Sequence, residues 1–250
     1  MTADFDQPDD CFAHPRLAAV YDIIDGRRDD LDLYIGATVE FEVRTVLDVG
    51  CGTGSLSSAL AARGIDVIGL DPASASLAVA QTKPHAERVR WIHGTVDDLP
   101  ATVQADLAVM TGNVAQVFIT DDQWQSTLTA VAAALIPTGR LIFETRIPAV
   151  RAWESWTPDR TRRRHDLPTR ETVEYWLELI DVALPLVTFR SHYHFRPDNS
   201  VLTSDSTLRF RTEAELRADL AATGFVVDEI RDAPDRPGKE MVFVASTRSS

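Results

Sequence analysis

Residues 46–54 read VLDVGCGTG and decide the fold, because an apolar run there leads directly into a glycine-rich turn. A continuous apolar run is typical of a strand that is buried on both faces of a parallel sheet. Glycines let the backbone come close to a bulky ligand, and the helix that follows such a turn offers free N–H groups. The segment therefore predicts a nucleotide-like ligand where a buried strand ends.

A second carboxylate, Asp71, ends the next apolar run at residues 66–71. It lies about 20 residues beyond the glycines, where an acid can accept hydrogen bonds from both ribose hydroxyls of a nucleotide. Dinucleotide-binding folds use the same logic, but their fingerprint is G-x-G-x-x-G. Here Gly54 falls one place before the third glycine of that pattern. The spacing therefore argues against a dinucleotide cofactor.

Short apolar runs alternate with helix-like stretches from about residue 44 to residue 145, which is the rhythm of a parallel sheet joined by helices. Two capping boxes, Thr120 with Gln123 and Thr212 with Glu215, each predict the start of a helix. The predicted helices are residues 124–135, stopped by Pro137, and 213–223, followed by Gly224. The predicted strands are residues 45–49, 66–70, 89–93, 106–110 and 141–145, with closing strands at 225–230 and 241–245.

Two further regions lie outside this rhythm. Residues 147–210 change to an arginine-rich loop and three stretches of period-two alternation, which predict an antiparallel insertion. Its strands are expected at residues 172–181, 187–195 and 201–210, separated by turns at 184–185 and 197–199. At the other end of the chain, residues 15–34 have a helical pattern and are expected to cap the same domain.

The length of 250 residues and the hydrophobic content of 44% suffice for one large core. We therefore expect one α/β domain with a doubly wound, mostly parallel seven-stranded sheet, helices on both faces and an antiparallel β insertion after the fifth strand. Its expected parts are an amino-terminal helical cap (1–43), a cofactor-binding core (44–146), the insertion as a substrate lid (147–210), and the last helix with the closing strands (211–250).

The composition argues against nucleic acids and membranes as partners. The 25 Lys and Arg residues against 38 Asp and Glu give a formal net charge of -13, which repels a phosphate backbone. No segment approaches the roughly 20 apolar residues of a membrane span, and the first ten residues contain no apolar run. Two cysteines do not make a disulfide framework. We expect a cytoplasmic protein without a nucleic-acid or membrane partner, and the sequence leaves the oligomeric state open.

The stretch DVGCGTG at residues 48–54 resembles the first motif of class I S-adenosylmethionine-dependent methyltransferases, and residues 70–72 resemble their acidic ribose-binding loop. The resemblance covers residues 44–145 and 212–245, and it implies S-adenosylmethionine as the cofactor. In that family the first acid orients the loop and the methionine ammonium, the glycines face the methionine part, and the second acid holds ribose. These positions and their direct neighbours are Asp48, Gly50, Cys51, Gly52, Gly54, Asp71 and Pro72.

The adenine contacts follow the family pattern less closely. Relatives often carry an acid directly after the glycine that opens residues 94–100, and here that residue is Thr95. Either Thr95 or Asp97 is expected to accept the hydrogen bond of the adenine amino group, while the Val96 N–H is the candidate donor to adenine N1. Tyr21 resembles part of a cofactor-covering helix in relatives, although plain helix packing is the alternative reading.

Residues 110–117, MTGNVAQV, look like the segment after the fourth strand in small-molecule methyltransferases. We expect Thr111, Gly112 and Asn113 to border the cofactor and the acceptor. Some relatives have a histidine where Val117 stands, so the resemblance supplies no general base here. Nucleic-acid N-methyltransferases of this fold often carry Asn/Asp-Pro-Pro-Tyr/Phe at this place, and the chain lacks that motif.

Candidate acceptor-binding residues are Arg146, Arg190, His192 and His194, and the two histidines are also the candidate catalytic groups. Alternation along residues 187–195 puts these last three on one face of a strand, opposite the apolar face. The alternative is that this polar face simply meets water, as antiparallel sheets commonly do on one side. The His-x-His pair lacks a matched set of further ligands, so no metal is expected.

The sequence thus predicts an S-adenosylmethionine-dependent methyltransferase that acts on a small molecule at nitrogen or oxygen. Two alternatives stay open because fold alone does not choose between them. One is methylation of a protein or an RNA, and the other is a non-catalytic module that binds S-adenosylmethionine.

Overall fold

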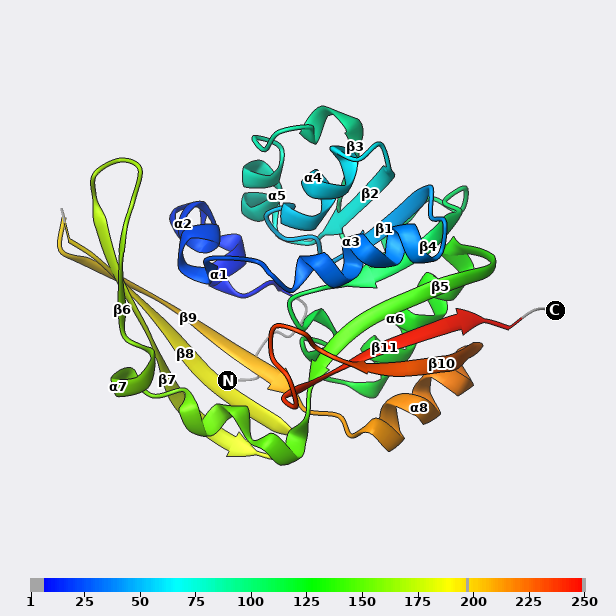
Figure 1. The fold of residues 1–250 in the computed structure, drawn as a ribbon. Coiled ribbons are helices and arrows are strands. Elements are labelled where there is room, and N and C mark those ends of the chain that lie inside the picture. The colour runs from blue at the N-terminus through cyan, green and yellow to red at the C-terminus, as the bar shows by residue number, and fades with distance from the viewer. Residues whose placement is uncertain (1–6, 197, 249–250) are drawn as a thin grey trace.

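The computed structural model describes residues 7–196 and 198–248. Seven strands form the central sheet in the order β10-β11-β5-β4-β1-β2-β3 (Figure 1). Their bounds are Thr45–Val49 (β1), Asp66–Asp71 (β2), Val89–His93 (β3), Ala105–Met110 (β4), Leu135–Arg146 (β5), Phe225–Asp232 (β10) and Glu240–Thr247 (β11). Only β11 runs antiparallel to its neighbours among these strands, and the others are parallel to one another. The predicted fold class is therefore confirmed.

The strand order reverses at β1, because the chain first moves outward to β2 and β3 and then returns to β4 on the other side of β1. Open α/β sheets bind ligands at this switch point, outside the carboxyl ends of the strands. Asp48 in β1 is in register with Val109 in β4, so both strands end side by side. The turn after β1 and the loop after β4 therefore meet at the place where a ligand is expected.

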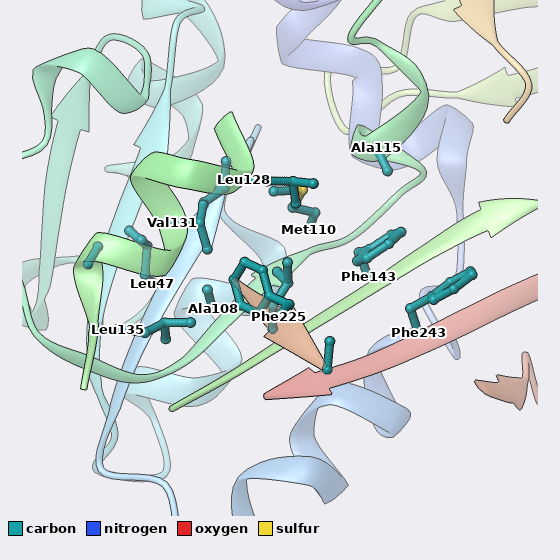
Figure 2. Close-up of a cluster of buried hydrophobic side chains, with 14 of the residues drawn as sticks. Leu47, Ala108, Met110, Ala115, Leu128, Val131, Leu135, Phe143, Phe225 and Phe243 are labelled. Atoms are coloured by element: carbon teal, nitrogen blue, oxygen red, sulfur yellow. The ribbon is translucent and has the colours of Figure 1, made fainter. Parts of the chain in front are cut away.

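Helices cover both faces of the sheet. On one face α3 (Leu31–Glu40) and α4 (Ser55–Ala61) contribute to an apolar cluster around Val46. On the other face α6 (Asp121–Ala134) and α8 (Glu213–Ala222) cover a larger cluster that includes Phe143 and Phe243 (Figure 2). These two rings stack with their centroids 5.1 Å apart, tying β5 to β11. The remaining core helix is α5 (Ser74–Ala80).

Both predicted capping boxes are present, at Thr120 and at Thr212. The role predicted for Pro137 is wrong, because α6 ends at Ala134 and β5 begins at Leu135. The ladder to β4 skips from Leu135 to Arg140, so Pro137 lies in an irregular part of the strand. A proline fits there because it supplies no N–H to a ladder.

The predicted helix at residues 15–34 is also wrong in extent. The structure has α1 (Asp10–Ala13), α2 (Pro15–Asp25) and then α3. The break comes at Gly26, whose φ of 77° ends α2 in a conformation that suits glycine. The break separates helices that pack on different parts of the molecule: α3 packs on the central sheet, while α1 and α2 contact the insertion (Figure 1).

The insertion forms its own antiparallel sheet in the order β6-β7-β8-β9. The strands β7 (Thr172–Ala183), β8 (Leu186–Phe195) and β9 (Ser200–Arg209) follow the predicted ranges closely. The arginine-rich stretch is not only loop, since it forms α7 (Pro158–Thr161) and a fourth strand, β6 (Arg163–Asp166). Short 3-10 turns complete the fold at Ala86–Arg88, Val96–Asp98, Val114–Gln116, Pro148–Val150 and Ala152–Ser155.

The apolar face predicted for β8 is the face that packs. Tyr193 and Phe195 join a cluster with Cys11 and Leu17 from the amino-terminal helices. At the other end of the strand, Val187 packs with a separate group that includes Trp153, Trp156 and Phe210. One face of the insertion is thus turned toward α1 and α2, and its opposite face is turned away from them.

Within residues 7–196 and 198–248, no helix is long and apolar enough to cross a membrane. In the same part of the chain, no group of three or more His, Cys, Asp or Glu side chains is arranged to hold a metal ion.

Candidate functional site

The turn after β1 brings the backbone unusually close to its surroundings. Gly50, Gly52 and Gly54 have φ values of 68°, 54° and 75°, which favour glycine. A Cβ atom on Gly50 would lie 2.7 Å from the Val114 side chain, and one on Gly54 would lie 2.7 Å from Trp91. A Cβ atom on Gly52 would meet no atom within 4 Å. Close packing therefore requires glycine at positions 50 and 54, while Gly52 faces open space in which a ligand can lie.

Asp48 lies beneath this turn and is only 1% exposed. Its Oδ2 accepts a hydrogen bond from Ser57 Oγ at 2.6 Å. Its Oδ1 is buried and has no hydrogen-bond partner among the residues that the structure describes. Burial raises the pKa of Asp48 to about 6, because the hydrogen bond from Ser57 and the attraction of Arg28 only partly offset the loss of water. A carboxylate in this state is suited to a cationic or hydrogen-bond-donating ligand.

Asp71 lies at the end of β2 and connects the glycine turn after β1 with the turn that follows β2. Its Oδ2 accepts the Gly52 N–H at 2.7 Å, and its Oδ1 accepts the Ala73 N–H at 2.8 Å. Burial raises the pKa of Asp71 above its ordinary value, although the two backbone donors work in the opposite direction. Each carboxylate oxygen has a second lone pair, so the side chain can still accept hydrogen bonds from a ligand diol. Pro72 is held beside it through its carbonyl, 3.0 Å from His93 Nε2.

The loop predicted to contact adenine lies next to Asp71, because the Gly94 N–H donates to the Asp71 carbonyl at 3.0 Å. Thr95 makes a capping box with Asp98 and thereby shapes the turn that carries Val96. Thr95 and Asp97 are both exposed. Both side chains are therefore accessible to a ligand base.

The amino-terminal helix α2 is fastened over the glycine turn. Asp22 Oδ1 accepts a hydrogen bond from Thr53 Oγ1 at 2.5 Å, and Asp22 Oδ2 lies 2.6 Å from Lys83 Nζ. Lys83 also donates to Ser55 Oγ at 2.7 Å. The preceding residue, Tyr21, is thereby held near the turn. Lys83 was not among the predicted site residues, and its only sequence signal is that lysine is rare in this chain.

The loop after β4 is held by two buried carboxylates. Glu144 Oε1 accepts the N–H groups of Gly112 and Asn113 at 2.6 and 3.2 Å, and its Oε2 accepts from the Tyr34 hydroxyl. Glu240 Oε1 accepts from Asn113 Nδ2 at 3.2 Å. Glu144 is 4% exposed, and burial raises its pKa. Sequence reasoning missed these acids, although Glu144 visibly interrupts the apolar run of β5.

A cavity of about 90 Å³ lies where α2 meets this loop, and we call it the α2 cavity. Four of the predicted site residues line it, namely Tyr21, Gly112, Asn113 and Arg146. Four residues that were not predicted complete the lining, namely Asp25, Arg28, Asp30 and Arg236. Val114, which follows the lining residue Asn113, lies against Gly50, so the loop after β4 connects the cavity lining with the glycine turn.

A larger hollow of about 270 Å³ lies elsewhere, between α6 and α8. It is lined by Asp121, Gln125, Arg209, Arg211, Glu215, Ala218 and Asp219. None of these residues belongs to the predicted site. The smaller α2 cavity is the better candidate because it shares its wall with the loops at the switch point.

The structure does not place Arg190, His192 or His194 in the lining of the α2 cavity. They lie on the face of β8 turned away from the amino-terminal helices, and each is engaged within the insertion sheet. Arg190 pairs with Asp205 at 2.5 and 2.7 Å. His192 stacks on Trp176 with ring centroids 4.8 Å apart, and His194 Nε2 lies 2.7 Å from Asn199 Oδ1. The predicted alternation along β8 is present, because Val187, Tyr193 and Phe195 are buried on the opposite face.

Comparison with known proteins adds independent information. Residues 46–139 match a family model described as a methyltransferase domain. The chain is 45% identical over 58 residues to a ubiquinone biosynthesis O-methyltransferase of Azorhizobium caulinodans, covering 22% of each chain. It is 33% identical over 108 residues to the cypemycin N-terminal methyltransferase of a Streptomyces species, covering 42% of this chain and 43% of that one. The chain thus spans less than half the length of these curated relatives.

Solved structures resemble the chain over nearly its whole length. One is the CcbJ methyltransferase of Streptomyces caelestis, with a TM-score of 0.75, 17% identity and coverage of 92% of this chain and 96% of that one. Another is CalS10, an amino pentose methyltransferase of Micromonospora echinaspora, with a TM-score of 0.71, 20% identity and coverage of 92% and 95%. At these identities the likeness shows the fold.

Proposed function

We propose that the chain is a class I S-adenosylmethionine-dependent methyltransferase that methylates a small-molecule acceptor. The match of residues 46–139 to a methyltransferase domain and the fold shared with solved methyltransferases support this proposal. The observation that carries the proposal is that the loop after β4 contacts the glycine turn through Val114 and lines the α2 cavity through Gly112 and Asn113. One loop would thus lie beside both the cofactor and the acceptor, as a transfer between two bound molecules requires.

The residues of the turn fit S-adenosylmethionine. The unpartnered Asp48 Oδ1 suits the methionine ammonium, either directly or through the loop that it supports. The open side of Gly52 leaves room for the methionine part, and Asp71 can accept the ribose hydroxyls. Thr95 and Val96, on the loop beside Asp71, are our candidates for the adenine contacts.

When bound, S-adenosylmethionine supplies a methyl group that is already activated by the sulfonium. The protein therefore has to align the acceptor and to exclude water, tasks that need no dedicated base. The clamp of Asp22, Thr53 and Lys83 holds α2 over the turn and so closes one side of the site. Glu144 fixes the loop that carries Asn113 and thereby fixes the opposite wall.

A small acceptor is favoured over a polymer because the α2 cavity is small and lies under α2. The neighbouring structures include an amino pentose methyltransferase and a sugar N-methyltransferase, in line with a small polar acceptor. A second candidate is the terminal amine of a peptide, which the similarity to the cypemycin N-terminal methyltransferase favours. Methylation of RNA is disfavoured by the net charge of -13.

Isothermal titration calorimetry tests the cofactor part of the proposal. The protein is titrated with S-adenosylhomocysteine and, separately, with NAD. We expect saturable binding of S-adenosylhomocysteine alone, because the spacing of the glycines departs from the dinucleotide pattern. Binding of NAD without binding of S-adenosylhomocysteine would overturn the proposed function.

A further inference from the structure

The hollow of about 270 Å³ between α6 and α8 lies apart from the α2 cavity, and we call it the α6–α8 hollow. Its lining includes Arg209, the last residue of β9, and Arg211, two residues further along the chain. Phe210 between them packs instead on Trp153, with ring centroids 4.6 Å apart. Two guanidinium groups from one short segment thus lie at the same hollow.

Arg211 is a buried cation without an anion of its own. It is 2% exposed, and its two Nη atoms donate only to loop carbonyls, at distances of 2.8 to 3.3 Å. Within the described residues its Nε has no hydrogen-bond partner. Burial, together with the repulsion of the Arg209 charge, lowers the pKa of Arg211 to about 10. Buried charges are ordinarily paired, so an anion in the hollow would be stabilised by this guanidinium.

Arg209 offers a second donor of hydrogen bonds. Its Nη1 donates to the Ile119 carbonyl at 2.9 Å, and its Nη2 lies 2.7 Å from Asp121 Oδ1. Its Nε is buried and has no acceptor in residues 7–196 and 198–248. A buried N–H without an acceptor is costly, and for a guanidinium the oxygens of a carboxylate or a phosphate are the strong acceptors. The two Nε–H groups together therefore suit one oxyanion.

The amino termini of two helices lie at the same hollow. Asp121 is the first residue of α6 and Glu215 is the third residue of α8, and both line the hollow. The two helices have 14 and 10 residues, so each has a dipole whose positive end favours a negative charge. The helix termini thus add to the attraction that the two arginines exert on an anion.

Three carboxylates also line the hollow, and two of them already have partners. Asp121 pairs with Arg209, and Glu215 accepts hydrogen bonds from the Thr212 N–H and hydroxyl, both at 2.7 Å. Asp219 forms no ion pair in the described part of the chain. Burial raises the pKa of Asp219, although the attraction of Arg211 works in the opposite direction. Asp219 is therefore the carboxylate that would compete with an incoming anion for Arg211.

From these observations we infer that the α6–α8 hollow is a second ligand site, which binds the phosphate or carboxylate group of a small molecule. The oxyanion accepts hydrogen bonds from Arg209 Nε and Arg211 Nε and faces the amino termini of α6 and α8. The inference does not depend on methyl transfer, because the α6–α8 hollow and the α2 cavity have no lining residue in common.

Inorganic phosphate and acetate, titrated separately into the protein, test the inference. The ionic strength is kept constant with sodium chloride, so that the general screening of charges does not change. Binding is followed by phosphorus NMR line broadening for phosphate and by proton saturation-transfer NMR for acetate. We expect saturable binding of at least one of them, and the tighter binder identifies the group that the hollow prefers. The absence of saturable binding by both would overturn the inference.

The variant Ala218→Glu tests the location of the bound anion. Ala218 is exposed on α8 and lines the hollow, so a carboxylate there would repel an anion while both arginines stay in place. We expect binding to weaken by about ten-fold or more. Ala133→Glu is the matched control, because it adds the same charge at an exposed position of α6, about 18 Å along the helix from Asp121. Equal affinities of these two variants would place the anion outside the hollow.

Two further variants test the charge of the ligand and the choice of cavity. Asp219→Asn removes the competing carboxylate and should tighten binding by about three-fold or more. Weaker binding by this variant would contradict a site for anions. Arg146→Gln changes the α2 cavity alone and should keep the wild-type affinity for the anion. Loss of binding in Arg146→Gln would assign the anion to the α2 cavity and overturn the inference.

Discussion

Asp48 is a carboxyl group placed where ionisation is costly. It is almost fully buried, it has one hydroxyl donor, and burial raises its pKa to about 6 from the ordinary value of 3.8. The folded protein therefore holds a proton on Asp48 that the unfolded chain has already lost between these two pH values. A positively charged ligand would offset the cost of ionising Asp48, because it would supply the partner that Oδ1 lacks within the described residues.

The cost predicts a pH dependence of stability. Above pH 6, ionised Asp48 lowers the free energy of unfolding of the ligand-free protein by roughly 3 kcal/mol, because folding raises its pKa by about two units. Below pH 3.8, Asp48 is protonated in both the folded and the unfolded state and does not lower this free energy. Relative to wild type, Asp48→Asn should therefore gain stability by about that amount as the pH rises from 4 to 7. Urea unfolding at a series of pH values measures the difference. A difference that does not change with pH would show that Asp48 is ionised without penalty.

Asp71 permits a direct test of the ribose assignment. Asp71→Ala removes a charged acceptor of hydrogen bonds and should weaken S-adenosylhomocysteine binding by roughly ten- to a hundred-fold, equivalent to about 1.5–3 kcal/mol. Asp66→Ala is the control, because Asp66 lies exposed at the far end of the same strand. Calorimetry on both variants gives the affinities. Unchanged binding by Asp71→Ala would remove the carboxylate from the site.

At the residue scale, the sequence predicted those site residues whose role depends on local spacing. Asp48, the glycines and Asp71 lie within one strand-turn-helix unit and one neighbouring strand. Glu144 and Asp25 were missed because their role depends on how distant segments pack. Glu144 reaches Tyr34 across 110 positions of sequence, and no local pattern announces such a contact.

Among the elements, the loop between β4 and α6 is also held by a buried arginine, Arg211. Arg211 is 2% exposed, and its guanidinium donates to the carbonyls of Ala115, Phe118 and Thr120 at 3.3, 2.8 and 3.2 Å. The same loop carries Asn113 at its start. The segment after β9 therefore supports the wall of the α2 cavity from behind.

Replacing this support should destabilise the protein. Arg211→Met leaves three loop carbonyls without their donor, and we expect a loss of about 2–4 kcal/mol in the free energy of unfolding. Arg217→Met is the matched control, since Arg217 makes only an exposed pair with Glu213 and should change stability by less than about 0.5 kcal/mol. Urea denaturation compares the two. Equal stabilities for both variants would refute the supporting role of Arg211.

Element prediction succeeded where the hydrophobic pattern was strong. The bounds of β1 and β3 agree to the residue with the apolar runs, and both capping boxes mark true helix starts. Strand β6 was missed because its sequence, RRHD, contains no apolar residue and forms a strand only by pairing with β7. The break after α2 was missed because the helical pattern continues beyond Gly26, while the two halves pack on different partners.

For the whole molecule, the net charge argues against nucleic acid as a partner. A formal charge of -13 opposes binding to a phosphate backbone, and the arginine-rich stretch is partly neutralised, for example by the Arg162 and Glu174 pair. We expect no sub-micromolar binding to duplex DNA or structured RNA at physiological salt. A gel-shift titration checks this. Tight binding that weakens steeply with added salt would instead favour a nucleic-acid substrate.

The central claim is that this chain transfers a methyl group to a small molecule. The most direct measurement incubates the protein with S-adenosylmethionine labelled in its methyl group and with an extract of the cells that make the protein, separated by size. We predict that label appears in the small-metabolite fraction with wild type and is strongly reduced with Asp71→Ala. Label that enters only polymer, or no fraction at all, would contradict the account.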